Sequence, residues 1–77
     1  MADRQTILDW LQQAEGHVSL GQEHLSRQRK IVWELERDGH DATDAKALLI
    51  QFEELQALHV ADRDRLIAEL AGVSPSI

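Results

Sequence analysis

The sequence predicts an all-α fold in which two long helices form an antiparallel hairpin. Apolar residues recur at steps of three and four over two stretches, 4–37 and 42–71, as they do on one side of a helix. A short turn at 38–41, containing Gly39, separates the two stretches. The 77 residues hold only four Gly and one Pro, too few for the many turns of a β-sandwich or barrel. We therefore expect one helical-hairpin domain, with residues 72–77 as a frayed tail.

The first predicted helix begins beside two residues that can cap it, Asp3 and Thr6. Gly16 and Gly21 lie inside it, and each lowers helix stability by about 1 kcal/mol relative to Ala. The apolar register continues across both glycines, so we expect an unbroken helix, with a kink near Gly16 as the alternative. The predicted inward positions form a heptad line: Ile7, Leu11, Ala14, Val18, Gly21, Leu25, Gln28, Val32 and Leu35.

The turn and the second helix carry their own local signals. Gly39 is predicted to take the left-handed conformation that ends many helices, and Asp41 to cap the next one. Gly72 and Pro75 are predicted to stop the second helix. A hairpin that turns at 39–41 pairs residues whose numbers add up to 80. The predicted inward positions of the second helix are Ala45, Leu48, Phe52, Leu55, His59, Asp62, Leu66 and then Glu69 or Leu70.

Many apolar residues, including both tryptophans, fall outside these two inward lines. Burying one large apolar side chain is worth about 1.5–3 kcal/mol, and one pair of helices has no third layer to cover the rest. We therefore expect a two-fold homodimer that forms a four-helix bundle, with an unidentified protein partner as the alternative. The residues expected at this interface are Trp10, Ile31, Trp33, Leu49, Ile50, Val60 and Ile67.

A polar layer is predicted in the middle of the hairpin, formed by His17, Gly21, His59 and Asp62. We favour a structural layer in which Asp62 accepts a hydrogen bond from a histidine and Gly21 leaves room for the His59 ring. A pH switch and a metal site are the alternatives. Metal-binding bundles normally carry a Glu-x-x-His pattern, which this sequence lacks, so we assign no metal ligands and expect no cofactor.

Composition argues against several classes of function. The chain has no Cys, no Tyr, no Gly-rich phosphate loop and no nucleophile elbow, so we do not expect an enzyme. Its net charge of −6 disfavours nucleic-acid binding, for which Arg27, Arg29 and Lys30 form the only local excess of positive charge. The sequence also predicts no membrane-spanning segment, and we expect a cytoplasmic protein.

The sequence resembles a group of short bacterial proteins that carry an RDGHD turn between two long helices. The likeness rests on the turn segment 34–41, on 52–59 and 62–66 of the second helix, and on a histidine-containing heptad repeat in the first. What the resemblance implies is a helical hairpin, without an activity, a cofactor or a site.

Taken together, these patterns predict a small, non-catalytic module for protein–protein interaction or oligomerisation. The alternative is a helical bundle that responds to a ligand, a metal or pH through the layer of His17, His59 and Asp62.

Overall fold

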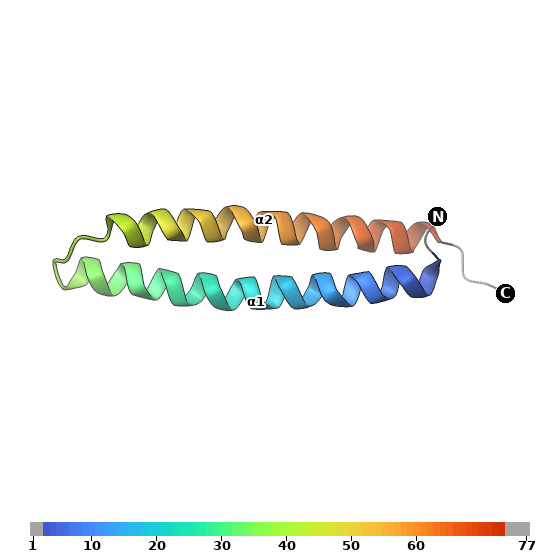
Figure 1. The fold of residues 1–77 in the computed structure, drawn as a ribbon, viewed down its shortest axis with the longest axis horizontal. Coiled ribbons are helices and arrows are strands. Elements are labelled where there is room, and N and C mark those ends of the chain that lie inside the picture. Colours follow the sequence, from blue (N-terminus) through green and yellow to red (C-terminus); the bar gives the residue numbers. More distant parts are fainter. Residues whose placement is uncertain (1–2, 74–77) are drawn as a thin grey trace.

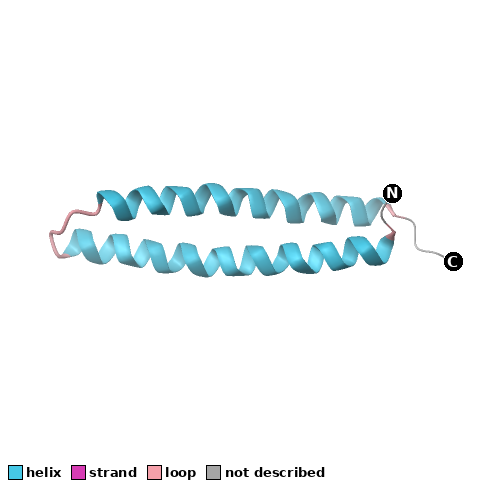
Figure 2. Ribbon diagram, viewed as in Figure 1, coloured by secondary structure: helices cyan, strands magenta, loops and turns pink. Residues whose placement is uncertain are grey.

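The computed structural model describes residues 3–73, which form two antiparallel helices joined by a short turn (Figure 1). Helix α1 spans Arg4–Arg37 and helix α2 spans Thr43–Gly72. The helices lie side by side along their whole length, with the connecting loop at one end (Figure 2). The molecule is a rod of 63 × 14 × 13 Å, one helix pair in cross-section. The predicted all-α hairpin is thus confirmed.

Helix α1 is capped by Asp3, whose side chain accepts a hydrogen bond from the backbone N–H of Thr6 at 2.8 Å. This bond satisfies one of the four amides that a helix start leaves without a partner. It also holds the pKa of the Asp3 carboxyl below its usual value of 3.8, because the ionised form is the better acceptor. The helix runs through Gly16 and Gly21 without interruption, as the continuous apolar register predicts.

Gly39 ends α1 as predicted, with a φ of 76° that places it in the left-handed region. The backbone N–H of His40 donates to the carbonyl of Leu35 at 2.8 Å, and that of Gly39 donates to Glu36 at 3.2 Å. These two bonds form a Schellman motif, which satisfies carbonyls that the helix end would otherwise leave free.

Helix α2 begins at Thr43, one residue later than the sequence predicts, and ends at Gly72. Ala42 occupies the N-cap position and is buried, while Asp41 lies one residue before it. The Asp41 carboxylate accepts from the Thr43 backbone N–H at 3.0 Å and from its hydroxyl at 2.6 Å. The hydroxyl bond, with the backbone bond second, lowers the pKa of Asp41. The predicted stop at Pro75 lies outside the described residues.

The two helices pack through a narrow seam, and the α1 side of this seam is as predicted: its nine inward positions are buried or half-buried. On α2 every second predicted position is wrong, because Leu48, Leu55 and Asp62 are exposed. In each case the residue that follows in the sequence lies in the seam instead. These residues are Leu49, Gln56 and Arg63. The heptad alternation is therefore correct on α2, but half of its positions are shifted by one residue.

The register of the hairpin also differs from the prediction. His17 lies against His59 and His24 against Phe52, and Gly21 packs against Gln56. These pairs have residue numbers that add up to 76 or 77, instead of 80. The observed pairing is therefore displaced from the predicted one by three to four residues, about one helical turn.

The seam is apolar at the open end of the hairpin and partly polar elsewhere. Ile7, Ala14 and Leu66 form the buried cluster at the open end, with Leu11, Leu70 and Val73 packed against it. Towards the turn, two buried glutamines each reach across to the backbone of the other helix. Gln28 donates to the carbonyl of Ala45, and Gln56 donates to the carbonyl of Val18, both at 2.9 Å.

Candidate functional site: an apolar face lined with histidines

One flank of the hairpin combines exposed apolar side chains with imidazoles. On α1, the residues at positions 10, 17, 24 and 31 are spaced seven apart and therefore lie on one side of the helix. On α2, Leu48 and Leu55 have the same spacing. We call this surface the histidine face, and its members are Trp10, His17, Leu20, His24, Ile31, Leu48, Leu55 and Leu58. Both helices contribute to it, since His17, Leu20 and His24 line one groove together with Leu55.

Two ring contacts across the seam form the middle of the histidine face. The ring centroids of His17 and His59 are 5.2 Å apart, with the ring planes tilted by 43°. His24 lies against Phe52 with a centroid distance of 5.8 Å. His17 is exposed, whereas His59 and His24 are half-buried, so the imidazoles stand at the boundary between the seam and solvent.

The groove beside these rings has a volume of about 120 Å³. Gln56 forms part of its lining and is buried, with its side-chain oxygen lacking a hydrogen-bond partner. A Cβ on Gly21 would overlap that oxygen. Gly21 therefore leaves room for the Gln56 amide, whereas the sequence had assigned this space to His59.

The predicted polar layer forms only in part. His17 and His59 come together as expected, and Gly21 lies beside them. Asp62, however, is exposed and accepts a hydrogen bond from Arg65 at 2.6 Å, one turn along its own helix. It lines a shallow depression with Trp10 and His17, at the edge of the histidine face. Among residues 3–73 there is no group of three His, Asp or Glu side chains placed to hold a metal ion.

The predicted interface residues do not form a single patch. Trp10 and Ile31 belong to the histidine face, while Leu49 and Val60 are half-buried in or beside the seam. The remaining three lie on the other flank, which we call the opposite face: Trp33, Ile50 and Ile67. The leucines that complete the histidine face were not among the predicted interface residues: Leu20, Leu48, Leu55 and Leu58.

Trp33 makes a cation–π contact within its own helix. The Arg37 guanidinium lies 4.9 Å from the centre of the indole, one helical turn further along α1. Trp33 remains 60% exposed, because a single arginine covers only part of its ring.

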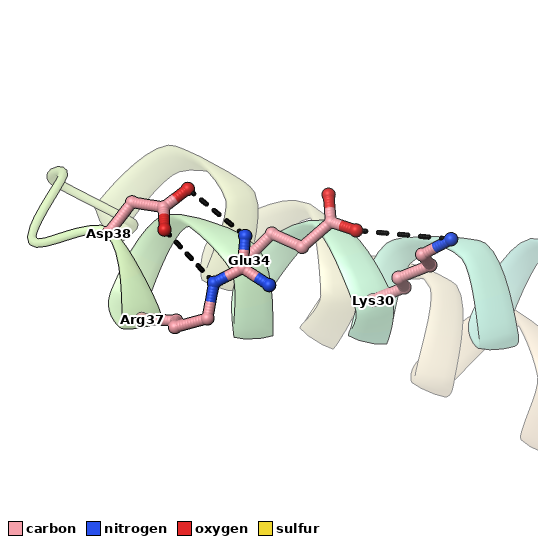
Figure 3. Close-up of polar contacts among 4 residues, drawn as sticks. All are labelled: Lys30, Glu34, Arg37 and Asp38. Atoms are coloured by element: carbon pink, nitrogen blue, oxygen red, sulfur yellow. Dashed lines mark hydrogen bonds and ion pairs between the residues drawn. The ribbon is translucent and has the colours of Figure 1, made fainter.

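The basic residues near the turn are paired with carboxylates (Figure 3). The Nζ atom of Lys30 lies 3.9 Å from Oε1 of Glu34. The Nε–H of Arg37 donates to Oδ1 of Asp38 at 2.9 Å, and this bond raises the pKa of Arg37. Across the seam on the opposite face, Lys46 pairs with Glu36 at 2.8 Å. These exposed pairs add little stability, but they reduce the positive field that phosphate binding needs.

No protein-family model, curated protein or solved structure matches this chain. Within residues 3–73, neither helix is apolar over the length that crossing a membrane requires.

Proposed function

We propose that this chain is a small, non-catalytic interaction module that works by self-association into a four-helix bundle. The observation that supports this proposal is the exposure of its apolar side chains. Among residues 3–73, nine large hydrophobic residues are 39–68% exposed, including both tryptophans, while six hydrophobic residues are buried. A hairpin has no further layer to cover the exposed ones, and the simplest cover is a second hairpin.

The free energies involved are of the size that association requires. Covering the exposed half of one large apolar side chain contributes on the order of 1 kcal/mol. Six such residues on each of two copies would contribute roughly 12 kcal/mol, within the range of about 4–15 kcal/mol that association costs in lost motion. The gain and the cost are thus of similar size, and the dissociation constant depends on how closely the two surfaces pack.

The shape of the single chain also supports a binding role. The groove of about 120 Å³ on the histidine face is smaller than the roughly 300–1,000 Å³ typical of ligand and substrate pockets. Its lining is mostly hydrocarbon and imidazole, which suits contact with another protein surface.

The mass of the protein in solution tests this function. Sedimentation equilibrium at micromolar concentrations should give twice the chain mass of 8.7 kDa. Tryptophan emission should shift to shorter wavelength as the concentration rises through the dissociation constant, because Trp10 becomes covered. A chain that stays monomeric up to millimolar concentration would refute self-association.

A second candidate function is a pH-responsive bundle, favoured by the contact between His17 and His59 at 5.2 Å. Protonation of both rings would place two positive charges side by side, and histidine is the side chain that gains charge near neutral pH. The pH dependence of self-association tests this function, because a purely structural layer would leave it unchanged.

A further inference from the structure

We propose that the histidine face is the surface that binds a second copy of this chain, with the two turns at opposite ends of the bundle. This inference rests on the proposed self-association and adds the face, the partner and its orientation. Six of the nine exposed large hydrophobic residues belong to the histidine face, and three to the opposite face. The six are Trp10, Leu20, Ile31, Leu48, Leu55 and Leu58.

The area of this face matches what a specific dimer needs. A helix of 34 residues is about 50 Å long at 1.5 Å per residue. With a rod width of 14 Å, the face covers roughly 700 Å² per copy. Stable interfaces bury about 800 Å² on each partner, so one flank of the hairpin is large enough for one dimer contact.

The apolar residues of the histidine face are arranged about a centre. Trp10 and Ile31 lie towards opposite ends of α1, and Leu20 lies about midway between them. In the observed register Leu58 is roughly level with Leu20 on the other helix. A two-fold axis crossing the rod at this level would place Trp10 over Ile31 of the second copy and bring the central leucines together.

Charge favours one of the two possible orientations, although Lys30 already offsets part of the charge on Glu34. By heptad spacing, Glu34 lies in line with Leu20 on α1 and Asp44 lies in line with Leu58 on α2, so both border the histidine face near the turn. With both turns at the same end, Glu34 would stand opposite Asp44 of the second copy, twice in each dimer. Like charges placed directly opposite each other disfavour an interface. With the turns at opposite ends, Glu34 meets the open end near Thr6 of the second copy, and this repulsion disappears.

The face is tested with a matched pair of charge substitutions. Leu20 and Ile50 are 51% and 55% exposed, so glutamate at either position leaves the seam intact. We expect Leu20→Glu to raise the dimer dissociation constant by at least about 100-fold, because two carboxylates would be buried near the axis. Ile50→Glu, on the opposite face, should change it less than about threefold. Circular dichroism of both variants checks that the helices remain folded.

The outcomes separate this inference from the proposed function. A wild-type chain that is monomeric contradicts both. A wild-type dimer that Ile50→Glu disrupts, or that both variants disrupt equally, contradicts only the assignment of the histidine face. Leu58→Glu, on the other helix of the same face, gives an independent check should Leu20→Glu reduce the helix content.

The orientation is tested by a distance across the dimer. The chain has no cysteine, so His40→Cys introduces one labelling site, in the exposed turn. Two spin labels at this position should be roughly 50 Å apart when the turns lie at opposite ends of the bundle. A separation below about 25 Å would show both turns at one end and overturn the proposed orientation.

Discussion

At the scale of single residues, the two glycines inside α1 have different surroundings and should respond differently to substitution. A Cβ on Gly16 would meet nothing within 4 Å, so Gly16→Ala should stabilise the fold by about 1 kcal/mol through helix propensity. At Gly21 the same Cβ would displace the Gln56 amide, which donates to Val18. Losing that bond costs about 0.5–1.5 kcal/mol, so Gly21→Ala should give no net gain. Urea unfolding of both variants measures the difference.

A double variant provides the control for this comparison. With Gln56→Ala already present, Gly21→Ala should recover most of the stabilisation seen for Gly16→Ala, because no amide remains to be displaced. Equal stabilisation by the two single glycine variants would contradict the packing of Gln56 against Gly21.

Residue-scale contacts of this kind could not be predicted from the sequence. Gln56 is polar and lies 38 positions from Val18, the residue whose carbonyl accepts its hydrogen bond. No local pattern identifies a buried amide whose partner lies on the other helix. The proximity of His17 and His59 could be predicted, because each follows the heptad spacing of its own helix.

At the scale of the helices, the boundaries were predictable to within one residue because caps and turn glycines act locally. Gly39 ends α1 through its own backbone conformation, and Asp3 caps it through a bond to an amide three residues away. The seam of α2 was not predictable in the same way. Leu48 and Leu55 are the more hydrophobic candidates, yet the polar Gln56 lies inside because its amide finds a partner across the seam.

The aspartates at the two helix starts, Asp3 and Asp41, predict how the stability of the fold changes at acidic pH. Hydrogen bonds to Thr6 and Thr43 lower the pKa values of Asp3 and Asp41 below 3.8 in the folded chain. A lowered folded-state pKa means that both carboxylates stabilise the fold above pH 3.8, and that this contribution is lost as the pH falls through the lowered values. Acid titration followed by circular dichroism should therefore show a loss of stability below about pH 4.

Asparagine at positions 3 and 41 is the matched control for this titration. Asn accepts the same backbone bond without ionising, so a variant with Asp3→Asn and Asp41→Asn should lose less stability between pH 5 and 2. Identical acid transitions for the variant and the wild type would show that the capping carboxylates do not contribute to the pH dependence.

At the scale of the whole molecule, the hairpin leaves its imidazoles where a second copy would cover them. On the histidine face, His17 shares a depression with Asp62 and Arg65, and His24 lies beside Arg27 and Phe52. Asp62 is already bonded to Arg65, which reduces its ability to offset a charge on His17. Protonating the histidines would thus add positive charge to a surface that would lose water in the proposed dimer.

Self-association should therefore weaken as the pH falls from about 7.5 to 5.5, the range in which histidine gains its charge. We expect the dimer dissociation constant to rise at least about tenfold, measured by sedimentation at constant ionic strength. The variant His17→Gln with His24→Gln should lose most of this dependence. His40→Gln should keep it, because His40 is exposed in the turn, away from the histidine face. A pH dependence that persists without His17 and His24 would point to His59, their neighbour in the groove. A dependence that also persists after His59→Gln is added would contradict the pH-responsive function of this face.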